Sequence, residues 1–355
     1  MTLQRQMTFW LVAFLALAAL LWLLGEVLLP FVAGMVLAYL LDPLARRAER
    51  MGISRGVSAL VVLTLVIVIV VIGVMAAAPV LADQIAAFSK NLPRYVTKLQ
   101  SLISDPSRPW LAKLFGGNLP DPGKSVETLV TQGSGFIVGF LTSLWSGGRA
   151  VFSVLSLLII TPVVAFYLLC DWERLVKTVN GWVPVPHRKT VHALARKIDR
   201  AIAGFVRGQS LLCLILAAYY AIALTLCGLN FGFLIGLITG LFSFIPFVGA
   251  LTGFVVAAIV AVAQFWPDWV SIALVVGVFI LGQGLEGYVL SPKLVGAEVG
   301  LHPVWLMFAL LASGYLFGFV GLLVAVPLAA ALGVLIRFAI GKYKESPIYT
   351  GKGTD

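Results

Sequence analysis

The chain has 355 residues, of which 61% are hydrophobic and 11% are charged, whereas a soluble protein carries about 25% charged residues. This composition excludes an ordinary soluble protein. The formal net charge is +10, but the basic residues cluster between apolar runs, so membrane topology explains them better than a nucleic-acid partner does. The three cysteines lie in or beside apolar runs and offer neither a disulfide framework nor a metal-ligand spacing.

The N-terminal segment, residues 1–82, contains three apolar runs. Gln6–Gly25 is longer than the apolar core of a signal peptide, and a second apolar run follows at once, so we interpret it as a retained membrane helix. Val27–Leu41 is short for a crossing, whereas Gly56–Ala82 is uncharged and long enough to cross a bilayer. A basic loop that includes Arg46 and Arg55 separates these two runs.

Residues 83–148 are polar and predict a small extracytoplasmic helical region. Apolar residues recur there at roughly helical spacing, which indicates at least one amphipathic helix. Residues 149–170 then form another membrane helix. The apolar positions of the amphipathic helix are Ile85, Phe88, Leu92, Tyr95 and Leu99.

Residues 171–207 form a basic segment with apolar residues on one helical face. This pattern fits an amphipathic helix lying at the cytoplasmic membrane surface. The alternative is a solvated helix that packs on its own domain. The apolar positions are Val191, Leu194, Ile198, Ile202 and Phe205.

The transport region that we expect over residues 208–338 begins with a long uncharged run. No Asp, Glu, Lys or Arg occurs from Gly208 to Pro267, and this length corresponds to roughly three crossings. The run is interrupted in its middle at Phe244–Gly249. After the next helix, Trp269–Leu290, the uncharged run Val304–Ile336 is interrupted in turn around Gly318. A polar tail, residues 339–355, follows.

Three pairs of consecutive apolar segments are joined by similar short sequences. This repetition predicts broken or re-entrant helical hairpins. The sequences are Pro30-Phe31-Val32, Pro246-Phe247-Val248-Gly249 and Gly318-Phe319-Val320-Gly321. Broken helices persist at membrane depth only where protein or a water-filled cavity covers them, and in transporters they often lie at the substrate site. We therefore expect Pro246, Gly249, Gly318 and Gly321 to shape a transport pathway or gate. The alternative is that Phe, Val and Gly recur by chance in a chain rich in them.

The distribution of Lys and Arg predicts the orientation. Basic loops favour the cytoplasmic side, which places both termini and the 171–207 segment in the cytoplasm and residues 83–148 outside. The fold class that follows is an all-α polytopic membrane protein with about eight transmembrane helices, located in the bacterial inner membrane.

Polar groups at membrane depth are the candidate site residues. Glu286 and Gln283 share an otherwise apolar helix, and intramembrane ionisable residues usually face the bundle interior. Glu286 is either a proton or cation site or a structural partner of Lys293 or Arg207. Gln209 is either a polar anchor or a pathway residue. His302 belongs to the polar loop after Lys293 and is a structural or ion-pair candidate.

No catalytic constellation, phosphate loop or metal-ligand cluster is present in the sequence. We therefore expect no enzyme activity, no cofactor and no metal. A membrane enzyme and a non-transporting membrane scaffold remain as alternative classes.

The chain resembles the autoinducer-2 exporter family of permeases across almost its whole length. The matching motifs are Leu29-Pro30-Phe31, Ala38–Leu44, Thr161-Pro162, Phe166–Leu169, Arg207-Gly208-Gln209, Phe244–Gly249, Glu286-Gly287, Leu290–Gly296, Val299–Pro303 and Gly318–Pro327. The resemblance implies a transporter that works as a homo-oligomer, namely a pentamer, with an elevator-like movement of part of each subunit. It implies export of an autoinducer-2-like polar solute or, alternatively, sodium(lithium)/proton antiport.

Overall fold

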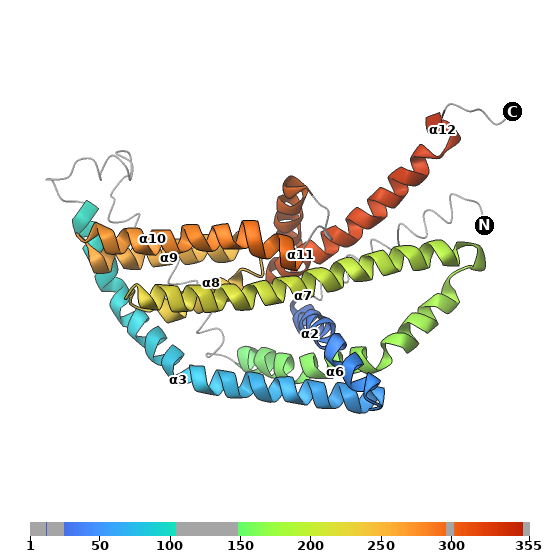
Figure 1. Ribbon diagram of the computed structural model, residues 1–355, viewed down its shortest axis with the longest axis horizontal. Coiled ribbons are helices and arrows are strands. Elements are labelled where there is room, and N and C mark those ends of the chain that lie inside the picture. Colours follow the sequence, from blue (N-terminus) through green and yellow to red (C-terminus); the bar gives the residue numbers. More distant parts are fainter. Residues whose placement is uncertain (1–11, 13–24, 104–147, 296–301, 351–355) are drawn as a thin grey trace. The chain divides into compact units, whose positions relative to one another are not determined.

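The computed structural model describes Val12 and residues 25–103, 148–295 and 302–350, and every regular element in them is helical (Figure 1). Six helical segments among these residues are long and apolar enough to cross a membrane. A shorter apolar helix, α8 (Gly232–Phe242), accompanies them. The prediction of an all-α polytopic membrane protein is confirmed.

The chain divides into two compact units. The first comprises Met1–Val66, Ser156–Gln209 and Ser291–Asp355, and the second comprises Ile67–Leu155 and Ser210–Leu290. Three continuous helices, α3 (Arg55–Ile103), α6 (Gly148–Trp182) and α7 (Arg188–Leu226), run through the segment boundaries expected at residues 82, 170 and 207. Those boundaries remain predictions about where the chain leaves the membrane.

In the first unit, helix α2 (Gly25–Arg50) packs on α6 and on α11 (Pro303–Lys344). The Thr161 hydroxyl donates to the Pro30 carbonyl oxygen over 3.2 Å. A Cβ built on Gly34 would lie 2.8 Å from Val164 Cβ, so glycine allows the close crossing of α2 and α6 here. The short elements of this unit are η1 (Val185–His187), α12 (Pro347–Thr350) and, from Ser291 onward, the last part of the wide-turn helix η2 (Leu285–Val295).

The first of the three expected turns is wrong. Pro30 lies inside α2, which is helical from Gly25 to Arg50. Proline removes one backbone donor and kinks or breaks a helix interior, but in a membrane helix neighbouring groups can compensate for such a defect. Through the Thr161 hydroxyl, α6 contacts the backbone of α2 at this proline.

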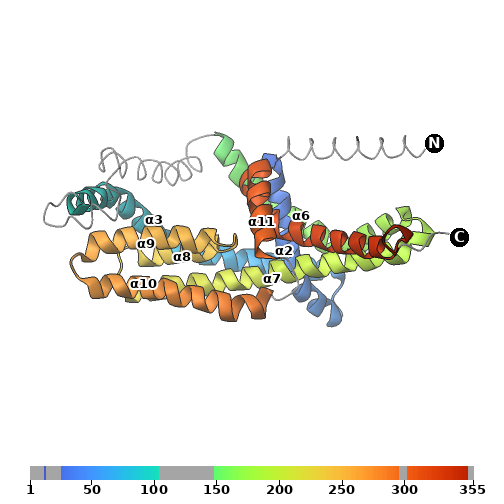
Figure 2. The same cartoon turned by 90° about the horizontal axis from the view of Figure 1, so that it is seen from above.

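In the second unit, α8, α9 (Val248–Phe265) and α10 (Trp269–Gly284) lie side by side in both ribbon views (Figures 1 and 2). Three glycines spaced four residues apart form one face of α8, namely Gly232, Gly236 and Gly240. A Cβ on any of them would collide with the α7 backbone, at Leu224, at Tyr220 and Ala221, and at Ala217, respectively. Small residues let helix backbones approach closely in membranes, where apolar burial alone does not drive helices together.

The end of α3 that belongs to the second unit is fastened to the start of α8. The Gln84 side-chain oxygen accepts from the Leu234 backbone N–H over 3.0 Å and so caps α8, whose own N-cap residue, Phe231, offers no side-chain cap. The Phe88 ring meets Phe231 edge to face, with centroids 5.3 Å apart. Asn230 Nδ2 donates to the Tyr95 hydroxyl over 3.2 Å.

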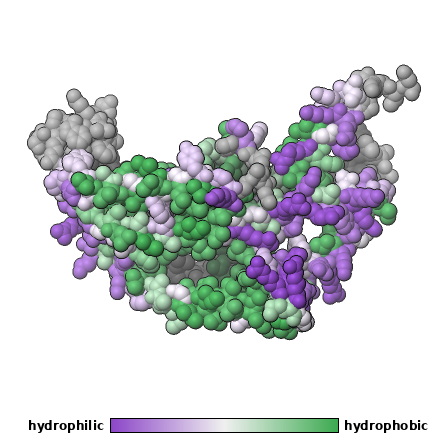
Figure 3. Space-filling view, in the orientation of Figure 1, coloured by the Kyte–Doolittle hydropathy of each residue, from purple (hydrophilic) through white to green (hydrophobic). Residues whose placement is uncertain are grey.

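The surface of the described helices is strongly patterned (Figure 3). Hydrophobic residues cover much of α3 and of the α8–α10 group, as expected for faces that contact lipid. Hydrophilic residues gather where α6 and α7 join, in the basic segment. Within that segment Phe205 is buried, Leu194, Ile198 and Ile202 are half-buried, and Val191 is exposed.

Candidate functional site

Among the polar clusters of the described residues, two are centred on a carboxylate in or beside an apolar helix and are the candidates for a site. One surrounds Asp42 in the first unit, and the other surrounds Glu286 in the second. Each is built from residues that are distant in sequence or on different turns.

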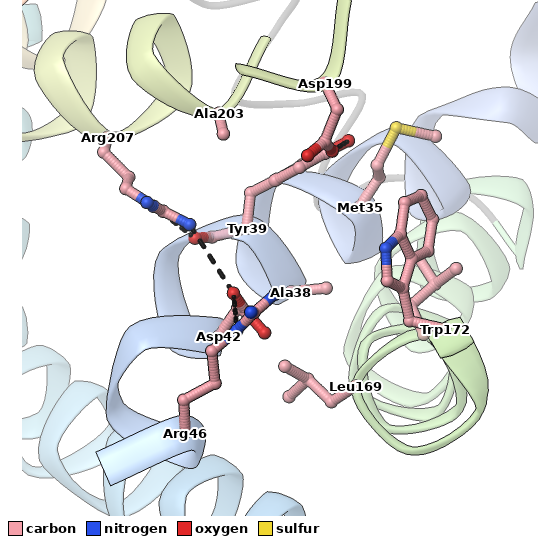
Figure 4. Close-up of a pocket in the computed structure, with 11 residues that line it drawn as sticks. Met35, Ala38, Tyr39, Asp42, Arg46, Leu169, Trp172, Asp199, Ala203 and Arg207 are labelled. Carbon is pink, nitrogen blue, oxygen red and sulfur yellow. Dashed lines mark hydrogen bonds and ion pairs between the residues drawn. The ribbon is translucent and has the colours of Figure 1, made fainter. Parts of the chain in front are cut away.

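Asp42 collects three guanidinium groups, of which those of Arg46 and Arg207 are drawn in Figure 4. Its carboxylate is 2.8 Å from Arg46 Nε, 3.0 Å from Arg55 Nη2 and 3.6 Å from Arg207 Nη2. These arginines come from α2, from the start of α3 and from α7, so a single carboxylate joins three helices. Asp42 is largely buried, with 17% of its side chain exposed, and a carboxylate buried to this degree requires such partners.

Tyr39, one turn before Asp42, extends this cluster into a pocket (Figure 4). Its hydroxyl donates to Asp199 Oδ1 over 3.0 Å, and its backbone carbonyl accepts from Arg207 Nε over 3.0 Å. The Tyr39 and Trp172 rings meet edge to face at 6.3 Å. The pocket thus presents both signs of charge and two aromatic rings, a lining suited to a small polar molecule. Its remaining lining residues are Met35, Ala38, Arg46, Leu168, Leu169 and Ala203.

The predicted motif Arg207-Gly208-Gln209 lies at the edge of this first cluster. Arg207 belongs to the cluster itself. A Cβ on Gly208 would collide with the Leu294 carbonyl, so glycine is required where α7 crosses η2. Gln209 is 5% exposed and is therefore buried. In this motif Arg207 supplies a charge to the Asp42 cluster, and Gly208 permits the close crossing of α7 and η2.

Glu286 lies in η2, directly after α10, and pairs with Gln283. Gln283 Nε2 donates to Glu286 Oε2 over 3.0 Å. Glu286 is half-buried, whereas Gln283 is exposed. Within the described residues no Lys, Arg or His forms an ion pair with Glu286, and the predicted partner Arg207 is bonded to Asp42 instead. Wide-turn helical segments of this kind are frequent at functional sites.

The break predicted around Pro246 is present between α8 and α9. Phe247 adopts a left-handed conformation, with φ 69°, and α9 begins at Val248 without a side-chain cap. A Cβ on Gly249 would collide with the Ser243 backbone N, so the first turn of α9 presses against the end of α8. The Ser243 hydroxyl donates to the Thr239 carbonyl oxygen over 2.8 Å inside this buried corner.

The second predicted break, at Gly318, interrupts α11. Gly318 has φ 58° and ψ −137°, a combination that is essentially restricted to glycine. A Cβ on Gly321 would collide with the Ser313 carbonyl oxygen, so Gly321 allows the chain to fold back closely after the break. Both glycines therefore have conformational reasons for their positions.

Lys293 and His302 hold more ordinary positions. Lys293 is exposed and has no ion-pair partner in the part of the chain that the structure describes. His302 is the N-cap of α11, where its Nδ1 accepts from the Val304 N–H over 3.3 Å. No group of three or more potential metal ligands occurs among the described residues.

Two features of the structure are not predicted by the sequence. The role of Asp42 as the centre of a cluster depends on Arg55 and Arg207, which the basic loops already contained without indicating a common partner. The second feature is Tyr220, whose side chain is fully buried and whose hydroxyl has no hydrogen-bond partner in the described structure. The signal that could have indicated Tyr220 was a tyrosine in the uncharged part of α7 that follows Arg207.

Comparison with known proteins assigns the family. The family model described as AI-2E family transporter matches residues 11–341. YrrI of Bacillus subtilis (strain 168) is 31% identical over 320 residues, which cover 89% of this chain and 87% of the relative. PerM of Escherichia coli (strain K12) is 25% identical over 314 residues, covering 87% and 86%.

A protein of Mycobacterium tuberculosis (strain CDC 1551 / Oshkosh) is 26% identical over 339 residues, covering 93% of this chain and 89% of the relative. The names of these relatives, all of them provisional, describe a transport protein for the Bacillus and Mycobacterium relatives and a permease for PerM. Because the family model spans most of the chain, this multi-pass membrane protein belongs to the AI-2E family of transporters.

Proposed function

We propose that the protein exports a small polar solute, of the autoinducer-2 kind, across the bacterial inner membrane. The observation that carries this proposal is the break between α8 and α9, where α9 begins with no side-chain cap. The first backbone N–H groups of a helix carry partial positive charge and bind electron-rich oxygen atoms. At membrane depth a broken helix of this kind is a typical position for a solute site.

The working unit that we propose is a homo-oligomer, namely a pentamer, with both termini and residues 171–207 in the cytoplasm. The support is the family relationship and the basic character of that segment. Exposed apolar residues on the described helices leave surface for both lipid and neighbouring subunits. Two single-cysteine variants in a cysteine-free background, Ser107→Cys and Thr190→Cys, should react with an impermeant thiol reagent from opposite sides of the membrane.

The test of export is flux in reconstituted vesicles. Purified protein should move autoinducer-2 down its gradient, and protein-free vesicles should not. Gly249→Ala places a methyl group against Ser243 and should lower the flux, because it disturbs the start of α9. Gly277→Ala is the matched control, since a Cβ there meets nothing within 4 Å. Normal flux through Gly249→Ala would remove the α8–α9 break from the pathway.

A second function, sodium(lithium)/proton antiport, is favoured by Glu286. Among the described residues its side-chain hydrogen-bond partner is the neutral amide of Gln283 alone, and a carboxylate without a basic partner at this depth can take up a cation or a proton. Measuring solute flux and sodium flux on the same vesicles, with and without a pH gradient, separates the two functions. Absence of both fluxes in correctly inserted protein would favour the scaffold alternative.

A further inference from the structure

The buried hydroxyl of Tyr220 needs an explanation. Tyr220 has a relative exposure of 0%, and its hydroxyl has no hydrogen-bond partner in the described structure. A buried polar group without a partner is destabilising, and in native proteins such groups usually have a ligand, a water molecule or a functional role. A phenylalanine would fill the same space without this disadvantage.

The position of the Tyr220 ring places its hydroxyl against α10, close to the helical turn that carries Gln283 and Glu286. The ring stacks on Phe279 with centroids 4.9 Å apart, and a Cβ built on Gly282 would collide with the hydroxyl oxygen. The hydroxyl therefore lies against α10 one residue before Gln283 and one helical turn before Glu286. The Gln283 side chain is the near polar neighbour of the hydroxyl, although the two form no hydrogen bond of normal geometry, and the charge of Glu286 also acts on Tyr220.

The three side chains supply a matched set of oxygen atoms. Glu286 offers a carboxylate, of which Oε2 accepts from Gln283 Nε2. Because the nitrogen of the Gln283 amide is used in that bond, its carbonyl oxygen is left for another partner. Tyr220 adds a phenolic oxygen. Oxygen ligands of this kind suit hard cations, and the single negative charge of the group is balanced by one monovalent cation.

We propose that Tyr220, Gln283 and Glu286 form one binding site for a monovalent cation, with the Tyr220 hydroxyl as a direct ligand. This inference deepens the second candidate function and rests on it. Gly282 permits the site, because any side chain there would displace the tyrosine ring. The adjacent Tyr219 is not part of the site, since its hydroxyl donates to the Val278 carbonyl oxygen over 3.0 Å.

The pair Tyr220→Phe and Tyr219→Phe tests this site, because each change removes one hydroxyl from neighbouring positions of the same helix. Thermal unfolding of the purified full-length protein is measured against sodium chloride concentration, with N-methylglucamine chloride keeping the ionic strength constant. A cation that binds only the folded protein raises the unfolding temperature. Glu286→Gln serves as the variant that lacks the charge.

The expected result is a sodium-dependent rise in the wild type and in Tyr219→Phe. Tyr220→Phe should need roughly tenfold more sodium for the same rise, the factor expected for the loss of one strong polar contact. Glu286→Gln should not respond. Without sodium, Tyr220→Phe should be at least as stable as the wild type, because the hydroxyl makes no hydrogen bond of normal geometry that the change would remove.

Three outcomes would overturn the inference. They are a wild type that does not respond to sodium, a Tyr220→Phe response at the wild-type concentration, and a sodium-free Tyr220→Phe protein that is less stable than the wild type. Sodium flux measured on the same preparations keeps this site apart from the antiport on which it rests. Sodium flux that Tyr220→Phe leaves unchanged would reject the cation site alone, whereas a sodium-dependent rise in unfolding temperature without sodium flux would reject antiport alone.

Discussion

The α7–α8–α9 region and the Asp42 cluster are held together by different physical means. In the first, glycines bring helix backbones into direct contact. In the second, one carboxylate and three guanidinium groups connect three helices. Close packing of backbones does not depend on salt but does not tolerate added volume. Ion pairs, in contrast, are weakened by salt and depend less on the volume of the side chains around them.

The largest expected effect comes from adding volume in the glycine-packed region. Gly240→Leu places a side chain against the backbone of Ala217 and should cost about 3 kcal/mol or more, since backbone has to move. We expect little monodisperse protein after purification and a clearly lower unfolding temperature. Gly277→Leu on α10 is the control, because the space beside Gly277 is open. Equal yields of the two variants would contradict packing by close backbone contact.

Removing the charge of Asp42 should have the next largest effect. Asp42→Asn leaves three arginines without their common acceptor, and we expect a loss of about 1–3 kcal/mol in the free energy of unfolding. Glu49→Gln is the matched control, because Glu49 is 46% exposed and, within the described part of the chain, forms its ion pair with Arg55 alone. That variant should lose under about 1 kcal/mol. The difference between the two variants is measured by thermal or denaturant unfolding, and it should shrink at high salt.

The break in α11 provides a smaller test. Gly318→Ala adds no clash, because nothing lies within 4 Å of a Cβ there, but φ 58° with ψ −137° is strained for alanine. The expected cost is about 1–3 kcal/mol in unfolding experiments. Gly341→Ala also meets open space, but Gly341 is not among the glycines with positive φ. The Gly341→Ala control should be neutral or slightly stabilising. Equal effects of Gly318→Ala and Gly341→Ala on stability would contradict a break in α11 at Gly318.

The smallest effect concerns Asp268, the N-cap of α10. Hydrogen bonds from the Ser271 hydroxyl, and from the backbone N–H groups of Ser271 and Val270, lower the pKa of Asp268 below its ordinary value. A carboxyl group with a lowered folded-state pKa contributes stability above its unfolded-state pKa, and this contribution is lost as the pH falls through the folded-state value. Asp268→Asn should therefore reduce the decline of the unfolding temperature in the acid range.

The sequence predicted the helical architecture and both central breaks because these depend on local chemistry. Uncharged runs define membrane helices, and a proline or a clustered pair of glycines marks an interruption, as at Pro246 and Gly318. Pro30 shows the limit of that reasoning, since a contact from Thr161 on another helix accompanies its position inside α2. Whether a proline ends a membrane helix depends on neighbours that the local sequence does not reveal.

The arrangement of the site was harder to predict, because it depends on pairs of residues far apart in the chain. Arg207 and Lys293 were equally plausible partners of Glu286, and only the helix register places Arg207 beside Asp42. The glycines of α8 repeat every fourth residue, but the helix that they face is a tertiary property. Tyr220 carried no signal beyond being a polar residue in an apolar helix.

The length of α3 has a practical consequence. Between Ile67 and Ile103 this helix extends roughly 55 Å, well beyond the hydrocarbon thickness of a bilayer. Its distal part holds α8 through Gln84 and Phe88. The exposed lysines Lys90 and Lys98 lie just beyond these contacts. A fluorophore attached there would report displacement of α8 during turnover while lying outside the apolar stretch, and it would thus provide an optical readout of the transport cycle in intact membranes.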